Sequence, residues 1–143
     1  MNDIDVFQAQ LATLESELSN LPQKETVLTH HFAEGIYGRE LLIPADTIVI
    51  GRRHRHSTLN IVLSGSISVF MGEGVSVKRI DAPAIFVSPP NTKKIGYTHT
   101  DTVFVNVHPA TGTDLEAIEA EAIITEEEYT RMVESGKGVL CLG

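Results

Sequence analysis

The clearest chemical signal in the sequence is a pair of histidines, His54 and His56, in the run Gly51-Arg-Arg-His-Arg-His56. On a β-strand, side chains two residues apart point to the same face, so both imidazoles and Arg52 can converge on one point. Imidazole is a common ligand of zinc, iron, nickel, manganese and copper, and one His-x-His strand can supply two ligands of a site. The spacing therefore predicts a metal site in this segment.

The arginines around this pair leave two other interpretations open. Three cations beside the strand would repel a divalent metal and depress the histidine pKa values, whereas an anionic ligand would be attracted to them. The histidines could also be surface residues of a strand with no further role. Arg39 adds to the second interpretation, because Arg39 and Glu40 point to opposite faces of a strand and an inward Arg39 could bind a carboxylate or a phosphate.

These residues lie in a stretch with the texture of an all-β domain. From Val27 to about His108, short runs rich in Val, Ile, Thr and Phe alternate with turn residues such as Ser64-Gly65. The predicted strands are Gly38–Ile43, Thr47–His56, Leu59–Ser64, Ser66–Met71, Val75–Ile80, Ile85–Val87, Lys94–Thr98 and Thr102–His108. About eight strands at this spacing indicate a sandwich or barrel, with a double-sheet jelly roll as the natural candidate.

Helical patterns flank the β region. Residues 4–18 place apolar side chains at helical intervals, and this helix is expected to end near Pro22. Thr113-Asp-Leu-Glu116 and Thr125-Glu-Glu-Glu128 have the form of capping boxes, which predicts two short helices, the second stopping at Ser135-Gly136. We therefore expect a single domain with an N-terminal amphipathic helix (1–22), a β-barrel (27–110) and an acidic helical segment (113–143).

Composition narrows the class of protein. A chain of 143 residues with 42% hydrophobic residues can bury a core without disulfides, and its single cysteine, Cys141, excludes an internal bridge. The formal net charge of −8 disfavours general nucleic-acid binding, and most of it comes from residues 113–134, which we interpret as a solvated helical face. Without a long apolar run or a basic secretory signal, we expect a cytoplasmic protein with no membrane association. GxSxG, Walker and GxGxxG motifs are absent.

The segment around the histidine pair resembles the first motif of the cupin superfamily, which carries His-x-His, usually a glutamate, and then a glycine turn. HRHSTLNIVLSG (54–65) is similar to a shortened first motif, and PAIFVSPPNTKK (83–94) resembles the second, PxG followed by a histidine. More closely, HHFAEGIYGRELLIPADTIVIG, FVSPPNTKKIGY, TDTVFVNVHP and TDLEAIEAE are similar to small cupin-fold proteins encoded by bacteriophages and prophages. The resemblance implies a mainly β cupin-type double-stranded β-helix, or jelly roll, with the flanking helices, and one divalent transition metal (Zn, Mn, Ni or Fe).

The sequence departs from the cupin pattern at two of the four usual ligand positions. Residues 57–60 offer no good metal ligand where the glutamate is expected, and Lys94 stands where the second motif has its histidine. His108, at the end of the last predicted strand, is one candidate replacement, and His31, before the first, is another. The predicted metal ligands are therefore His54, His56 and His108, and the predicted ligand-binding residues are Arg39, Arg52, Lys94 and Asn106.

Three functions follow from these observations. The first is a cupin-like barrel that binds a small, anionic molecule in its mouth, with or without a divalent metal. The second is a metal-dependent cupin enzyme of the isomerase, lyase or dioxygenase type. The third is a structural or partner-binding phage accessory protein that assembles through its terminal helices. The resemblance also implies a homodimer, and a jelly roll by itself fixes none of these functions.

Overall fold

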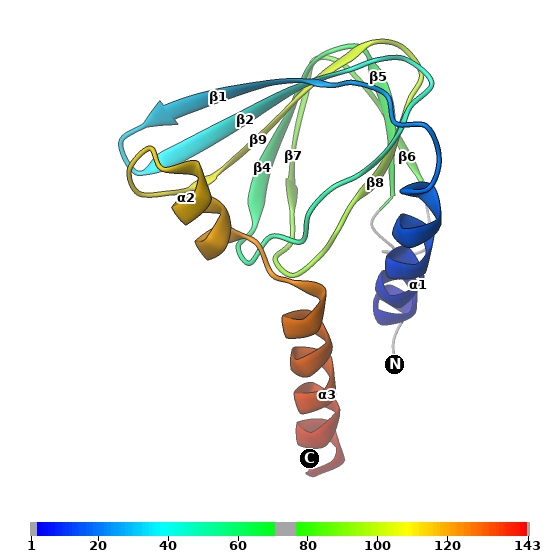
Figure 1. Ribbon diagram of the computed structural model, residues 1–143, viewed down its shortest axis with the longest axis vertical. Helices are drawn as coiled ribbons and strands as arrows, with labels where there is room; N and C mark the ends of the chain where they lie inside the picture. The colour runs from blue at the N-terminus through cyan, green and yellow to red at the C-terminus, as the bar shows by residue number, and fades with distance from the viewer. Residues whose placement is uncertain (1–2, 71–76, 143) are drawn as a thin grey trace.

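Two antiparallel β-sheets face each other in the structure, a computed structural model that describes residues 3–70 and 77–142 (Figure 1). Side chains are described for residues 10–70, except residue 12, and for residues 77–135. The sheets have the orders β1-β2-β9-β4-β7 and β3-β8-β5-β6. The strands are β1 (Val27–Ala33), β2 (Ile36–Ile43), β3 (Ile48–Ile50), β4 (Thr58–Ser64), β5 (Ser66–Phe70), β6 (Lys78–Asp81), β7 (Ala84–Ser88), β8 (Ile95–Thr98) and β9 (Thr102–Pro109). This arrangement confirms the mainly β, single-domain jelly roll.

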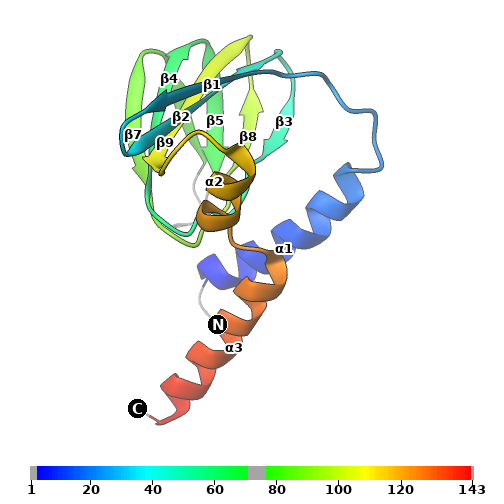
Figure 2. The same ribbon diagram turned by 60° about the vertical axis from the view of Figure 1, so that its left-hand side comes forward.

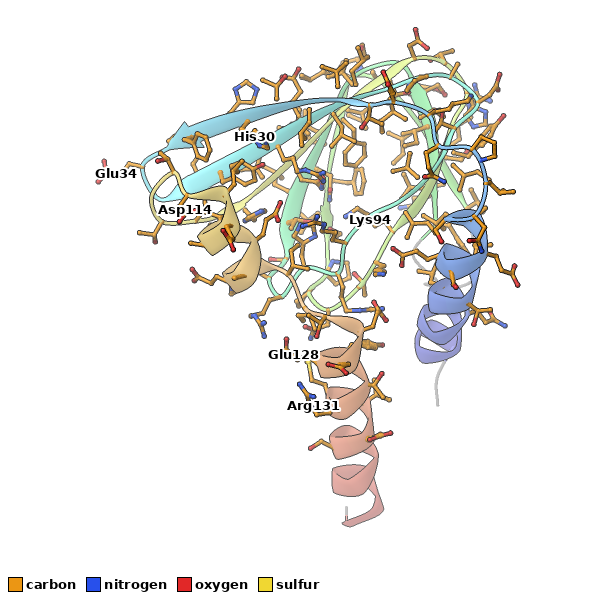
Figure 3. The ribbon with its side chains drawn as sticks, in the orientation of Figure 1. His30, Glu34, Lys94, Asp114, Glu128 and Arg131 are labelled. Carbon is orange, nitrogen blue, oxygen red and sulfur yellow. The ribbon has the colours of Figure 1, made fainter. Side chains whose placement is uncertain are left out.

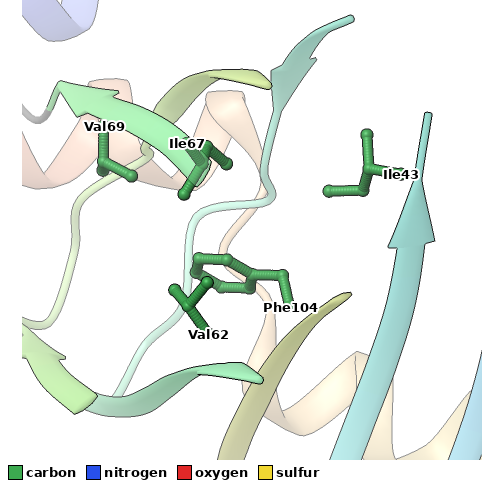
Figure 4. Packing of buried hydrophobic residues seen from close by; sticks show 5 residues of the cluster. All are labelled: Ile43, Val62, Ile67, Val69 and Phe104. Carbon is green, nitrogen blue, oxygen red and sulfur yellow. The ribbon is translucent and has the colours of Figure 1, made fainter. Parts of the chain in front are cut away.

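Alternation along the strands fills the space between the sheets. Apolar side chains from both sheets form the core cluster, which comprises Ile43, Val62, Ile67, Val69 and Phe104 (Figure 4). Burying each such side chain contributes about 1.5–3 kcal/mol to folding. The predicted turn between β4 and β5 is present, and it requires glycine, because Gly65 has a φ of 90° and a Cβ there would lie 2.3 Å from the carbonyl oxygen of Asp101.

Three helices flank the barrel: α1 (Asp3–Leu18), α2 (Leu115–Ala122) and α3 (Glu126–Leu142). Figure 2 shows α2 beside the barrel and α3 extending away from it. The Thr125 cap is confirmed, since its hydroxyl accepts from the Glu128 amide at 3.2 Å. The Thr113 cap is wrong, because Asp114 has the extended conformation and its carboxylate accepts from the Glu116 amide. The stop at Ser135-Gly136 is also wrong: α3 continues to Leu142, since glycine inside a helix costs only about 1 kcal/mol.

The strands differ from the prediction in three places. The strand Thr47–His56 ends at Ile50, because the backbone of residues 53–55 pairs with residues 122–124 and not with a sheet. The unpredicted strand β1 places His31 inside the first strand; nearly all of its side chains are exposed, so it has no alternating apolar pattern. The strand expected at Val75–Ile80 begins at Lys78, and residues 71–76, including Met71 of another predicted strand, lie outside the described residues.

Candidate functional site

A cavity of about 590 Å³ opens between the two sheets. Its apolar wall includes four residues of the core cluster, namely Ile43, Ile67, Val69 and Phe104. All four predicted ligand-binding residues line it together with one of the predicted metal ligands: Arg39, Arg52, Lys94, Asn106 and His54. The cavity therefore combines an apolar wall with a cluster of cationic and amide groups, which is the usual make-up of a small-molecule site.

Strands β2 and β9 place Arg39 and Asn106 side by side. The two residues are register partners in the antiparallel ladder, so their side chains emerge on the same face of the sheet. Along β2 this face also carries Leu41 and Ile43, which both line the cavity. Arg39 is half-buried, and burial lowers its pKa below the ordinary arginine value. Its predicted inward orientation agrees with this placement.

A polar network that the sequence analysis did not identify runs along the interior of β4, β7 and β9. Asn106 donates its side-chain amide to Oδ1 of Asn60 at 2.7 Å, and Asn60 donates to Oγ of Ser88 at 3.1 Å. Ser88 also shares a 2.5 Å hydrogen bond with the Thr58 hydroxyl. Thr58, Asn60 and Ser88 are all buried. The hydrogen bond to Asn60 fixes which end of the Asn106 amide is nitrogen, and the other end is the carbonyl oxygen, which can only accept.

Lys94 joins this network from the loop before β8. Its ammonium group donates to Oγ of Ser88 at 3.3 Å, and Figure 3 shows the side chain on the inner side of the barrel. Burial lowers the pKa of Lys94 to about 8. Within the described part of the chain, Lys94 forms no ion pair with a carboxylate.

The loop that carries His54 is held by backbone hydrogen bonds from two directions. The amide of Ile124 donates to the carbonyl of Arg53 at 2.8 Å, and the amide of Asn91 donates to the carbonyl of His54 at 2.8 Å. The amide of Arg55 donates to Ala122. The imidazole of His54 is thus positioned by contacts between distant segments of the chain.

The arginines of this loop bind the acidic C-terminal helices, which corrects the interpretation of those helices as a purely solvated face. Arg55 forms a two-pronged contact with Glu128, at 2.7 and 3.1 Å, and Arg52 pairs with Glu119 at 3.0 Å. Arg53 is buried and contacts α3 at two residues. Its guanidinium lies 3.5 Å from a carboxylate oxygen of Glu126 and 3.6 Å from the centre of the Tyr129 ring. Arg53 and Arg55 therefore attach α3 to the barrel, while Arg52 remains at the cavity wall.

The predicted metal ligands do not come together as a set. His54 and His108 are close, with ring centroids 5.4 Å apart, but His56 is exposed on the bend after the loop and does not line the cavity. His108 is buried, with its Nδ1 3.0 Å from the carbonyl oxygen of Pro109. His31 lies on the outer sheet face, 2.9 Å from a carboxylate oxygen of Glu40.

The environment of His54 also disfavours a cation. Burial, followed by the charges of Lys94, His108 and Arg39, lowers its pKa to about 4, against a weaker opposing hydrogen bond to the backbone of Arg52. Residues 3–70 and 77–142 contain no group of three side chains able to hold a metal ion. The residues present therefore do not fit the divalent metal that the cupin resemblance implies.

Comparisons with known proteins bear on the fold. No protein-family model matches the chain, and no curated protein is significantly similar to it. The solved structure of KdgF from Halomonas sp. superposes with a TM-score of 0.54 at 14% identity, over 67% of this chain and 90% of that one. The cupin domain of Schizosaccharomyces pombe Cnp3 gives 0.51 at 16% identity, over 78% and 77%. Salicylate 1,2-dioxygenase from Pseudaminobacter salicylatoxidans gives 0.53 at 16% identity, over 73% of this chain and 32% of the dioxygenase.

These similarities show that the fold is a cupin-type jelly roll. Identities of this size show shared architecture alone, because one fold carries many unrelated activities. The chain corresponds to about a third of the dioxygenase, so that enzyme's reaction belongs to a much longer protein. Among the described helices, none is both long and apolar enough to span a membrane.

Proposed function

We propose that the barrel binds a small anionic molecule, carrying a carboxylate or a phosphate, in the cavity between its sheets. Lys94 and Arg39 support this proposal most directly. Both line the cavity, and neither forms an ion pair with a carboxylate within the described residues. A partly buried cation without a counter-ion is costly, and an anionic ligand would supply that counter-ion.

The balance of charge around the cavity points in the same direction. Its lining contains four cationic side chains and one carboxylate, which are Lys24, Arg39, Arg52, Lys94 and Asp46. Lys24 donates to the backbone carbonyls of Ala45 and Asp46 at 2.9 Å, and Arg52 is shared with Glu119. His54 is neutral near pH 7, since its pKa lies at about 4. The carbonyl oxygen of Asn106 could accept a hydroxyl of the ligand, and the apolar wall could contact its carbon skeleton.

Thermal unfolding of the full chain with small anions tests the proposal. Lactate, pyruvate and inorganic phosphate would be compared with lactamide, a neutral counterpart of lactate. A ligand at 100 times its Kd stabilises the folded state by about 2.7 kcal/mol, and only anions should give such a shift. Comparing the carboxylates with phosphate identifies the preferred anionic group.

Matched variants locate the binding. Lys94→Met and Arg39→Gln should abolish the anion response, whereas Lys78→Met, at an exposed lysine of β6, should retain it. An anion response of equal size in the Lys94→Met and Lys78→Met variants would contradict binding in the cavity. The absence of any anion response in the unmodified chain would contradict the proposal as a whole.

Assembly is a second part of the proposal, and it concerns the outer face of the five-stranded sheet. This face is largely apolar and exposed: it includes Val27, Leu42, Leu59, Leu63, Ile85 and Val87. Its described charged residues, His31 and Glu40, pair with each other. A flat, nearly uncharged surface suits a second copy of itself, because two such sheets can pack face to face in a symmetric dimer. We therefore propose that the expected homodimer forms through this face and not through the terminal helices.

Sedimentation analysis of the Ile85→Lys variant tests this interface. The unmodified chain should sediment as a dimer and the variant as a monomer with an unchanged circular dichroism spectrum. Truncation of residues 1–20 provides the contrast, since loss of the dimer only in the truncated chain would assign assembly to α1. Origin in a phage or prophage, and a cytoplasmic location, remain predictions.

A further inference from the structure

The adjacent lysines Lys93 and Lys94 have opposite surroundings. Lys93 is buried and pairs with two carboxylates, Glu15 from α1 at 2.5 Å and Glu126 from α3 at 3.0 Å. It therefore connects the two terminal helices. Lys94 instead lines the cavity, and its amine has the hydroxyl of Ser88 as a hydrogen-bond partner. One lysine is held in ion pairs to the terminal helices, and the other belongs to the wall of a cavity large enough for a small molecule.

The surroundings of Lys94 favour its neutral, nucleophilic form. With a pKa of about 8, roughly 10% of this amine is unprotonated at pH 7, against roughly 0.04% of an ordinary lysine. Five other charged or titratable residues line the same cavity. They are Arg39 on β2, Arg52 and His54 on the loop after β3, Lys24 before β1, and Asp46 between β2 and β3. Burial is what lowers the pKa of Lys94, and an unprotonated lysine in a partly apolar cavity is a familiar type of activated nucleophile.

We propose that Lys94 forms an imine with the carbonyl group of an oxo acid, while Arg39 binds the carboxylate of the same molecule. This inference rests on the proposed function, because the oxo acid is one member of the class of small anions. An oxo acid carries the carboxylate expected of the ligand and, in addition, an electrophilic carbonyl group. A 2-oxo acid places the two groups on adjacent carbons, and Lys94 and Arg39 line the same cavity, so the inference requires both side chains to converge on one small molecule.

The step balances without a redox partner. The lone pair of the neutral Lys94 nitrogen forms a bond to the carbonyl carbon, and the carbonyl oxygen takes up a proton as the nitrogen loses one, which gives a carbinolamine. Expulsion of the hydroxyl group as water, with a proton supplied to it, leaves a carbon–nitrogen double bond. Water in the cavity can carry these protons between the amine and the departing oxygen.

Reductive trapping tests the inference on the full-length chain. The protein is incubated with pyruvate and sodium cyanoborohydride, which delivers hydride to an imine and makes the bond permanent. Intact-mass and peptide analysis then locate the adduct, whose mass is that of pyruvate less one oxygen. At pH 7 Lys94 should be labelled much faster than the exposed Lys78, because burial lowers the pKa of Lys94. Labelling at Lys94 should rise with a midpoint near pH 8.

Variants and a competitor separate the possible outcomes. Arg39→Gln should slow labelling at Lys94 without changing that at Lys78, and lactate, which lacks the carbonyl, should compete with pyruvate. Labelling spread evenly over surface lysines, while lactate still stabilises the protein, would overturn the imine but leave the proposed function standing. If lactate, pyruvate and inorganic phosphate all fail to stabilise the protein, the proposed function fails as well. Because labelling is read on the unmodified chain, the test does not depend on a Lys94 variant that folds.

Discussion

Replacement of Lys94 by methionine should make the protein more stable. The native side chain holds a cation in a partly apolar cavity, and the drop of its pKa from 10.5 to about 8 reflects the cost of burying that charge. At about 1.4 kcal/mol per pKa unit, this drop corresponds to about 3 kcal/mol. Methionine has a similar length and carries no charge, so the Lys94→Met variant removes this cost.

The hydrogen bond to Ser88 reduces the expected gain. Loss of a hydrogen bond of this kind costs about 0.5–1.5 kcal/mol, which leaves a net stabilisation of about 2 kcal/mol at pH 7. For a chain of this length, that corresponds to a rise of roughly 6 °C in Tm. A stabilising substitution at a cavity lysine would be typical of a residue retained for binding or chemistry.

The pH dependence of this gain has a definite sign. Below pH 8 the lysine is charged in both the folded and the unfolded chain, so the full cost is present. Between pH 8 and 10.5 the unfolded chain binds a proton that the folded chain has released, and the stability contributed by this group rises with pH. The advantage of the Lys94→Met variant should therefore be largest at pH 7 and vanish by about pH 10.5.

Urea denaturation at fixed protein concentration measures the effect, with linear extrapolation at pH 7 and pH 10. Lys78→Met is the matched control, because its exposed ammonium should change stability by no more than about 0.5 kcal/mol. The reasoning is refuted if the Lys94→Met variant is less stable than the unmodified chain at pH 7, or if its advantage persists unchanged at pH 10.

The other predictions concern His54, the arginine loop, the α3 cap and metal binding. The pKa of His54 is about 4 in the folded chain and about 6.5 in the unfolded chain. The stability that neutral His54 contributes is therefore complete above pH 6.5 and is lost as the pH falls towards 4. Denaturation curves of a His54→Gln variant should lack this pH dependence. Arg53→Met should cost about 2 kcal/mol, whereas Arg52→Met, at an exposed ion pair, should cost less than about 1 kcal/mol, and equal losses would contradict the distinction. Thr125→Ala should cost about 1 kcal/mol through the lost cap, and no loss would show that the hydroxyl is dispensable. Elemental analysis after incubation with Zn²⁺, Mn²⁺, Ni²⁺ or Fe²⁺ should give less than one equivalent of metal, and a full equivalent that disappears in the His54→Ala variant would contradict the fit argued from the site.

The strands that could be predicted are those whose patterns are local. β4, β5 and β9 alternate apolar and polar residues between clear turn signals, and each was found within about two residues of its predicted bounds. β1 was missed because its side chains are exposed on both faces, so no alternation marks it. The end of β3 was missed because residues 53–55 pair with residues 122–124, a contact between distant parts of the chain.

The charged residues of the site could be predicted from the sequence, whereas its buried hydrogen-bond network could not. Arg39 could be assigned from the alternation of β2, and Lys94 was conspicuous as a substitute for a histidine. Asn60 and Ser88 were not identified as site residues, although a signal existed: Thr58 and Asn60 are polar residues at the inward positions of a strand that also buries Val62. His56 was misplaced because the two-residue periodicity of a strand does not apply to the loop that carries it.

The surroundings of Lys94 link the departures from the cupin pattern to one another. Where a metal site requires an imidazole, this barrel has an amine, and where it requires a carboxylate, it has the Thr58–Asn60 segment, whose buried groups bond to Ser88 and through it to Lys94. The amine of Lys94 can bind an anion, and the buried polar groups of Thr58 and Asn60 hold Ser88, which accepts a hydrogen bond from Lys94. A site that had simply lost its metal would not be expected to keep an interior lysine that forms no ion pair with the described carboxylates, because methionine is expected to be more stable at this position. The cost of keeping Lys94 is therefore an argument that its nitrogen has a use in the cavity.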